Sequence, residues 1–322
     1  MQAIVQTSYG NAEVLTMGTI GQPQIADNEV LVDVRAAGLD RGTWHLMTGQ
    51  PYLIRLGFGL RRPRNPVPGL DLAGVVAAVG ADVTRFEVGD EVYGIGKGTL
   101  APFAAAREDK LARKPANLTY EQAAVVAVSA LTALQGLRDH ARVEAGQRVL
   151  IIGASGGVGT YAVQIAKAMG AEVTGVASAG KLELVRSIGA DHVIDYATTD
   201  FATGQPDYDV IFDIGGNATL SRLRSALAPK GTLVIVGGEE GGKWIGGIDR
   251  QIRATLLSPF VGQRMKTFVS KETAVDLDEL TKLLASGAVT PVVGQTYPLA
   301  EAAHAMGQLE DGLVRGKVAI TI

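Results

Sequence analysis

The sequence predicts an α/β protein in which a doubly wound parallel sheet is joined to a separate β-rich domain. Between Arg148 and about Val269, short apolar strands alternate with helices, a pattern typical of right-handed βαβ crossovers in a parallel sheet. A glycine-rich turn separates the first of these strands from its helix. Residues 1 to about 123 instead form short strands that stop at glycine or aspartate, which indicates a β-rich domain.

The remaining elements follow from the same patterns. In the β-rich part we expect strands at 3–6, 29–37 and 71–79. The run at 120–137 is rich in Ala, Val and Leu and predicts a connecting helix. In the alternating part we expect strands at 149–152, 172–177, 192–194, 209–213, 232–236 and 265–269, with helices at 158–169, 181–188 and 219–228. The long glycine-rich segment 237–262 is expected to cover a substrate pocket.

The C-terminal part returns to the first domain in this interpretation. It holds one amphipathic helix at 276–285 and a terminal strand at 317–322. The predicted domains are therefore residues 1–123 together with 275–322, and residues 124–274. A chain of 322 residues is long enough for two domains that each bury a core.

Composition excludes several classes of function. The chain has no cysteine, which excludes disulfides, thiolate zinc sites and cysteine nucleophiles. A net charge of -3 argues against nucleic acid as the partner. The N-terminus lacks the pattern of a signal peptide, and no apolar run reaches the ~18 residues of a membrane helix. We therefore expect a cytoplasmic protein with neither a nucleic-acid nor a membrane partner.

The strongest motif is the turn Ala154-Ser-Gly-Gly-Val-Gly159, which follows the first buried strand and opens a helix. Dinucleotide-binding glycine motifs require this context. In that register Ala154 takes the first glycine place, Gly156 the second and Gly159 the third. A turn that only packs a strand tightly against its helix would show the same glycines. The candidate cofactor contacts in the turn are Ala154, Gly156, Gly157, Val158 and Gly159.

The end of the second strand predicts which nucleotide binds. Sites that prefer NAD place a carboxylate about 20 residues after the glycines, where it binds the ribose hydroxyls. Here the strand ends at Ser178, with Lys181 just beyond. A hydroxyl and an ammonium would bind a 2′-phosphate that a carboxylate would repel. The sequence therefore favours NADPH, although Lys181 is also compatible with a solvated position on the helix.

Several segments together resemble the quinone oxidoreductase branch of the medium-chain dehydrogenase/reductase superfamily. They are Pro68-Gly-Leu-Asp-Leu-Ala-Gly74, Gly89-Asp-Glu-Val-Tyr93, Ala130-Leu-Thr-Ala133, the turn ending at Gly159, and the closing Gly316-Lys317. The resemblance spans nearly the whole chain. It implies a GroES-like catalytic domain made from both chain ends, a Rossmann domain that binds NADP(H) between them, and a homodimer.

The resemblance also implies roles for single residues. Ser178, Lys181 and Tyr196 match residues that surround the adenosine 2′-phosphate in that branch, and Thr132 matches one near the nicotinamide. A strand-end aromatic that packs on its neighbour is an equal interpretation of Tyr196. The expected cofactor contacts are completed by Gly237 and Lys317.

The sequence departs from the zinc alcohol dehydrogenases at their metal site. Those enzymes carry a His-Glu pair after the glycine that matches Gly69, and a cysteine in the segment that contains Asp40. Here Gly69 is followed by Leu70 and Asp71. A catalytic zinc needs about three well-placed protein ligands, and the chain's four histidines lie in unlike contexts. We therefore expect no metal.

Without a metal, reduction relies on hydride from the cofactor and on polar groups around the acceptor. Electron-poor acceptors, such as quinones and activated alkenes (enones), suit this chemistry. Tyr52 matches a tyrosine beside the nicotinamide in related reductases and is the candidate catalytic donor; an aromatic that only walls the pocket is the alternative. Other interpretations are a carbonyl or alcohol oxidoreductase, or an NADPH-binding protein without turnover.

Overall fold

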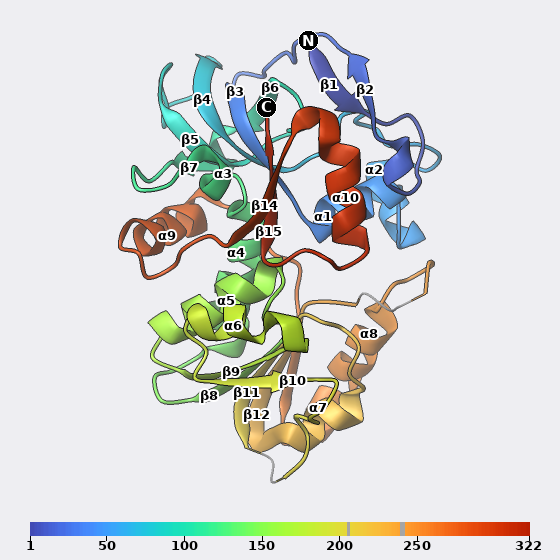
Figure 1. Cartoon of the computed structure of the whole chain (residues 1–322), viewed down its shortest axis with the longest axis vertical. Helices are drawn as coiled ribbons and strands as arrows, with labels where there is room; N and C mark the ends of the chain where they lie inside the picture. The colour runs from blue at the N-terminus through green and yellow to red at the C-terminus, as the bar shows by residue number, and fades with distance from the viewer. Residues whose placement is uncertain (205–206, 239–241) are drawn as a thin grey trace. The chain divides into compact units, whose positions relative to one another are not determined.

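The computed structural model describes residues 1–204, 207–238 and 242–322 (Figure 1). The chain forms two compact units. Unit 1 comprises residues 1–131, 271–287 and 291–322, and unit 2 comprises residues 132–270 and 288–290. Within the described ranges, no helix has the length and hydrophobicity that crossing a bilayer requires.

Unit 1 is built on a seven-stranded sheet in which the order is β14-β15-β3-β4-β5-β7, with β6 paired to β3. A separate antiparallel pair joins β1 (Gln2–Val5) to β2 (Thr16–Thr19). The strands of the large sheet are β3 (Glu29–Leu39), β4 (Asp71–Val79), β5 (Glu91–Ile95), β6 (Phe103–Arg107), β7 (Leu111–Arg113), β14 (Val293–Pro298) and β15 (Lys317–Thr321). The helices of this unit include α1 (Arg41–Thr48), α2 (Arg55–Phe58), α3 (Tyr120–Ala123), α9 (Ala274–Ala285) and α10 (Ala302–Glu310).

The C-terminal strand completes the sheet of unit 1. Strand β15 runs antiparallel to β3, with Val318 opposite Leu39 and Thr321 opposite Ala36. Unit 1 therefore contains strands from both ends of the chain. The prediction of a single helix in the last segment was wrong, because α10 follows α9. The buried face of α10 consists of Ala302, Ala305 and Met306. Because two of these three residues are small, the apolar pattern of this helix is weak.

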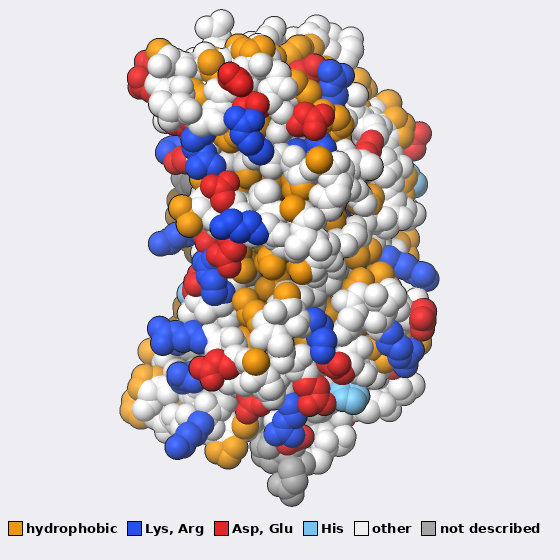
Figure 2. Space-filling view, turned by 90° about the vertical axis from the view of Figure 1, so that its left-hand side faces the viewer, with side chains coloured by type: hydrophobic (Ala, Val, Ile, Leu, Met, Phe, Trp, Pro, Cys, Tyr) orange, Lys and Arg blue, Asp and Glu red, His pale blue; other side chains and the backbone are white. Residues whose placement is uncertain are grey.

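The surface of the molecule carries mixed charge. Figure 2 shows acidic and basic side chains interspersed over one face. Exposed ion pairs within unit 1 include that between Arg85 and Asp278, where the nitrogen and oxygen are 3.1 Å apart. Exposed pairs of this kind contribute little to stability, so the fold depends on buried contacts.

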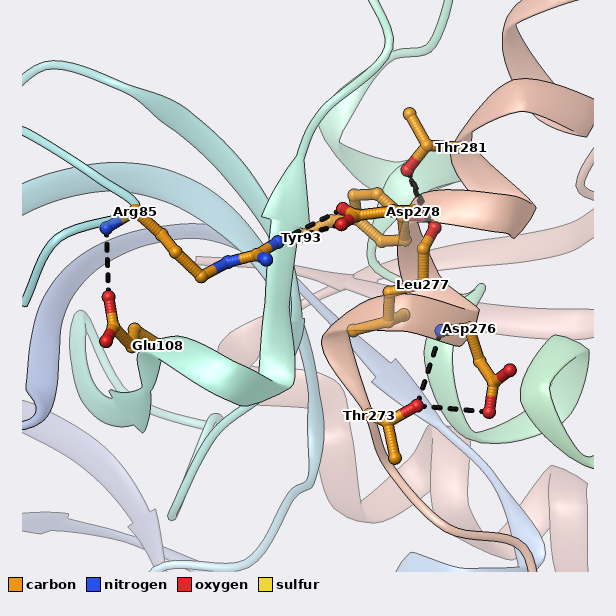
Figure 3. A network of polar contacts seen from close by, with 8 residues as sticks. All are labelled: Arg85, Tyr93, Glu108, Thr273, Asp276, Leu277, Asp278 and Thr281. Carbon is orange, nitrogen blue, oxygen red and sulfur yellow. Dashed lines mark hydrogen bonds and ion pairs between the residues drawn. The ribbon is translucent and has the colours of Figure 1, made fainter.

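A polar network attaches α9 to the sheet of unit 1 (Figure 3). The hydroxyl of Tyr93, on β5, donates to the carbonyl oxygen of Leu277 at 3.1 Å and lies 2.9 Å from Oγ1 of Thr281. Thr273 caps the helix by accepting a hydrogen bond from the backbone N–H of Asp276. This cap lets the helix begin at residue 274, two residues before the predicted start.

A buried ammonium group joins distant segments of unit 1. The side chain of Lys317 is 2% exposed, and its Nζ lies 3.0 Å from Oγ of Ser129, 3.4 Å from Oδ2 of Asp71 and 3.7 Å from Oδ2 of Asp40. Oδ1 of Asp71 accepts a hydrogen bond from the N–H of Val128. Oδ1 of Asp40 caps α1 by accepting from the N–H of Thr43 at 2.7 Å. We call Lys317, Asp40, Asp71 and Ser129 the ammonium cluster.

Unit 2 contains a six-stranded, fully parallel sheet in the order β10-β9-β8-β11-β12-β13. This is the order of a doubly wound dinucleotide-binding sheet, so the predicted fold is confirmed. The strands are β8 (Arg148–Ile152), β9 (Glu172–Ala177), β10 (His192–Asp195), β11 (Tyr208–Asp213), β12 (Leu227–Ile235) and β13 (Arg264–Thr267). The helices around them are α5 (Gly157–Ala168), α6 (Leu182–Ser187), α7 (Leu220–Ala226) and α8 (Ile248–Leu257).

Two predicted helices differ from the structure, and one α-helix of unit 2 was not predicted. The predicted helix 120–137 is divided into α3 and α4 (Ala127–Gln135), followed by a π-helical segment over Gly136–Ala141. The division between the two units falls inside α4. The predicted helix 219–228 ends at residue 226, because β12 begins at Leu227. Helix α8 was not predicted, since glycines precede it and only Ala254 among its apolar residues is fully buried.

We predict that the ammonium cluster makes stability fall as pH rises. Burial raises the pKa of Asp71 to about 7, although Lys317 opposes this shift. An unfolded aspartate has a pKa of about 4, so the contribution is complete below about pH 4 and is lost as pH rises through 7. The variant Asp71→Asn has no such proton to lose. The unfolding free energy of the wild type minus that of Asp71→Asn should fall between about pH 4 and 7, by up to about 1.4 kcal/mol per pH unit.

Denaturant titrations at several pH values measure this difference. The exposed Asp311 provides the control, because Asp311→Asn should keep the wild-type pH dependence. The same pH dependence in Asp71→Asn and the wild type would contradict the prediction.

Candidate functional site

The turn between β8 and α5 lies at the carboxyl end of the first strand of unit 2. Gly153 has a φ of +88°, a conformation that favours glycine. The tight turn thus falls at Gly153, one residue before the place that the motif register predicts. Ala154 has no positive φ and is completely buried, which explains why alanine is tolerated there.

Two glycines of the turn have different surroundings. A Cβ added to Gly159 would lie 2.1 Å from the carbonyl oxygen of Gly153, so only glycine lets α5 pack this closely against the turn. A Cβ added to Gly156 would meet only that same oxygen, at 3.5 Å. No protein atom therefore requires glycine at position 156. Space beside the backbone is what a pyrophosphate needs at this place.

The first turn of α5 offers its backbone amides to a ligand. Gly156 is the N-cap residue, and no side chain caps the helix. The first N–H groups of a helix lack intrahelical partners and lie at the positive end of its dipole. Together with the space beside Gly156, the amides of Gly157 and Val158 form a site suited to the negative charge of a dinucleotide.

The predicted 2′-phosphate residues gather at the ends of two adjacent strands. Strands β9 and β10 are paired, with Asp195 opposite Ala177, so Ser178 and Tyr196 follow at the same edge of the sheet. The N–H of Lys181 donates to the carbonyl oxygen of Ser178 at 2.9 Å. Tyr196 is 61% exposed, which leaves its ring accessible to a ligand. The structure thus brings Tyr196 to the same end of the sheet as Ser178 and Lys181, although Tyr196 lies 18 positions after Ser178 in the sequence.

An ion pair that sequence reasoning missed joins the end of β11 to α8. Nη1 of Arg250, on α8, lies 2.6 Å from Oδ2 of the fully buried Asp213. Nη2 of Arg250 donates to the carbonyl oxygen of Gly237 at 2.9 Å. A Cβ at Gly237 would lie 1.8 Å from the oxygen of Ile214. Gly237 is therefore held against the end of the neighbouring strand. The sequence signal for the ion pair was an aspartate at the end of a buried apolar strand.

Thr132 and Tyr52 are both held by local contacts. Oγ1 of Thr132 donates to Oγ of Ser270 at 3.0 Å within unit 2. In unit 1, the guanidinium of Arg55 lies 4.4 Å from the ring centre of Tyr52 and 4.4 Å from that of Tyr9. Such stacking orients the half-buried Tyr52 ring. Contact of either residue with a nicotinamide stays a prediction.

The ammonium of Lys317 is directed into its cluster, where Ser129 and the two aspartates surround it. A cofactor contact by this side chain stays a prediction of the resemblance. The same cluster shows whether the residues present could bind zinc, because Asp40 and Asp71 lie in the segments that carry zinc ligands in the alcohol dehydrogenases. An ammonium between two carboxylates does not fit a bound zinc, and among the described residues no group of three or more His, Cys, Asp or Glu side chains could hold a metal.

Comparisons with known proteins agree with both units. Residues 26–116 match the model of the alcohol dehydrogenase GroES-like domain, and residues 188–320 match that of the zinc-binding dehydrogenases. The chain is 33% identical to the chloroplastic NADPH-dependent alkenal/one oxidoreductase of Arabidopsis thaliana, covering 99% of this chain and 79% of the relative. It is 32% identical to quinone oxidoreductase of Sus scrofa, covering 95% and 92%.

A solved structure gives the same result. Quinone oxidoreductase of Escherichia coli, determined in complex with NADPH, superposes with a TM-score of 0.85 at 27% identity, covering 100% of both chains. The glycine turn, the parallel strand order and these relatives lead to one assignment: the chain belongs to the medium-chain dehydrogenase/reductase superfamily, in its zinc-independent quinone oxidoreductase-like branch.

Proposed function

We propose that this protein is an NADPH-dependent oxidoreductase that reduces quinones or activated alkenes such as enones. The observation that carries the proposal is the uncapped N-terminus of α5, with open space beside Gly156. Relatives named as a quinone oxidoreductase and as an NADPH-dependent alkenal/one oxidoreductase support the choice of acceptor and cofactor.

Each group of residues has a defined task in this proposal. The amides of Gly157 and Val158 bind the pyrophosphate, while Ser178, Lys181 and Tyr196 bind the 2′-phosphate. The bound cofactor supplies a hydride to the electron-poor carbon of the acceptor. Tyr52 donates a hydrogen bond to the acceptor oxygen as negative charge develops there. The ammonium cluster keeps α1, which leads into the Tyr52 segment, in place.

The proposal includes a homodimer, which the sequence resemblance implies. Strand β13 ends the sheet and is paired only with β12 among the described strands, so its outer edge is available to a second copy. Beside it α8 and the following turn expose apolar side chains, of which Leu256 is 66% and Phe260 85% exposed. Location in the cytoplasm stays a prediction of the sequence.

The two glycines of the turn provide a matched pair of variants. Gly156→Ala has room for its Cβ within the protein and should lower the unfolding free energy by less than about 1 kcal/mol, yet weaken NADPH binding at least about tenfold, because the methyl group enters the pyrophosphate space. Gly159→Ala should cost about 1 to 3 kcal/mol of stability through overpacking. Denaturant titration and fluorescence titration with NADPH measure the two effects. Wild-type NADPH affinity in Gly156→Ala would refute the site.

Lys181 should decide the preference for NADPH over NADH. Losing one charged hydrogen bond costs about 1.5 to 3 kcal/mol, so Lys181→Ala should weaken NADPH binding roughly ten- to a hundredfold and scarcely change NADH binding. Arg186→Ala, at an exposed position of α6, is the control and should change neither. Equal specificity constants for the two cofactors in the wild type would show that the preference is wrong.

Acceptor chemistry tests the function and the role of Tyr52 together. NADPH oxidation should be observed with a quinone and with an enone, and should be much slower with the corresponding saturated ketone. Tyr52→Phe should lower turnover on the enone about a hundredfold or more, since an oxyanion donor is worth about 2.7 to 4 kcal/mol. On the quinone, which accepts hydride readily, the loss should be smaller.

The control is Tyr120→Phe, which removes a hydroxyl that donates to Glu91 at the surface of unit 1 and should leave turnover unchanged. If Tyr52→Phe keeps nearly full turnover on both acceptors, the tyrosine only lines the pocket and is not the hydrogen-bond donor. Activity on carbonyls alone would favour a carbonyl oxidoreductase, and tight NADPH binding without turnover would favour a non-catalytic protein.

A further inference from the structure

One stretch of unit 1 carries basic side chains and no acidic ones. Residues 41–70 contain five arginines and no aspartate or glutamate, although the whole chain has a net charge of -3. On the face shown in Figure 2, acidic and basic side chains are instead interspersed. Three of these arginines, Arg61, Arg62 and Arg64, are exposed and lie within four residues of one another.

The same stretch exposes a dense group of large apolar side chains. In α2 and its flanking residues, Leu53 is 49% exposed, Leu56 65%, Phe58 51% and Leu60 67%. Single exposed apolar residues are ordinary on protein surfaces, whereas a group of them marks an interaction site. We call residues 53–64 the arginine loop; its α2 is labelled in Figure 1.

Internal polar contacts hold the arginine loop in this orientation. Arg55 lies between the rings of Tyr9 and Tyr52, and its Nε donates to the carbonyl oxygen of Gly49 at 2.9 Å. The hydroxyl of Tyr9 donates to the carbonyl oxygen of Gly59 at 2.6 Å. Polar groups therefore bond inward while the leucines and the phenylalanine face outward. In water, polar side chains usually face outward and apolar ones inward. Here the order is reversed, and the polar contacts of the loop hold the apolar side chains in their exposed positions.

The combination of groups indicates what covers this surface. Aliphatic and aromatic side chains insert into the boundary between lipid head groups and acyl chains, and arginines beside them bind lipid phosphates. An acidic surface is the matching partner for a stretch that has only positive charge. A lipid surface needs no shape complementarity, which suits a loop whose apolar side chains are spread over eight residues.

We propose that the arginine loop binds the surface of membranes that contain anionic lipids. This peripheral contact revises the expectation that the protein has no membrane partner, which considered only spanning segments. Its purpose rests on the proposed function, because quinones with apolar tails partition into bilayers and a loop beginning next to Tyr52 would bring the enzyme to them. The contact itself is independent of catalysis.

Sedimentation of the full-length protein with lipid vesicles tests the proposal. The protein should bind vesicles of phosphatidylcholine mixed with phosphatidylglycerol, bind pure phosphatidylcholine much less, and lose affinity as salt is added. Each arginine near an anionic surface changes affinity about fivefold, so Arg61→Glu with Arg62→Glu should weaken binding at least about tenfold. Leu56→Ser with Leu60→Ser should weaken it by a similar factor.

Matched variants elsewhere separate the loop from general charge and hydrophobicity. Val275 and Leu313 are 76% and 61% exposed in unit 1, and Val275→Ser with Leu313→Ser should bind vesicles like the wild type. Arg315→Glu with Lys230→Glu changes the net charge equally at two exposed positions and should also have little effect.

Several results would overturn the proposal. They are an absence of binding to anionic vesicles, equal loss of binding in the loop and control variants, and a loop variant that dissociates an oligomer while vesicle binding stays unchanged. The last result would assign the loop to a protein interface. Because vesicle binding is measured without substrate, it can succeed in an inactive protein. Turnover on a short-chain quinone in the loop variants then reports on catalysis separately.

Discussion

The buried ammonium of Lys317 joins segments of unit 1 that lie far apart in the chain. A charge with so little solvent must be compensated nearby, and the compensating groups come from three separate segments: Asp40 after β3, Asp71 at the start of β4, and Ser129 in α4. Strand β15 is thereby attached to the sheet at its first residue. Since Asp40 also caps α1, the same cluster orients the helix that leads to Tyr52.

This cluster also restricts the chemistry. Related alcohol dehydrogenases carry metal ligands in the segments of Asp40 and Asp71, where a zinc ion polarises a substrate oxygen. Here the positive charge belongs to a buried side chain that is already paired with carboxylates. The acceptor oxygen must then be stabilised by hydrogen-bond donors alone. Quinones and enones need less polarisation than simple ketones, which is why they are the acceptors in the proposed function.

In unit 2, three glycines of the turn after β8 are each required for a different physical reason. Gly153 adopts a positive φ, Gly159 permits close packing of α5, and Gly156 leaves room for a ligand. The arginine loop of unit 1 provides the contrasting case. Its inward polar contacts hold an apolar surface whose large side chains remain about half or more exposed, which is why we assign it to an external partner.

Much of this could be predicted from the sequence, because strand periodicity and glycine spacing are local properties. Strands β4 and β9 have the predicted bounds, and the glycine turn lies between a parallel strand and a helix as expected. Only the tertiary structure revealed the partners of Lys317, the pair of Asp213 with Arg250, and the outward direction of the arginine loop. Helices α8 and α10 also escaped prediction, since glycines or small residues weaken their apolar patterns. For the two ion-paired clusters the physical reason is that burial and charge pairing depend on segments far apart in the chain, whereas a linear pattern records only near neighbours.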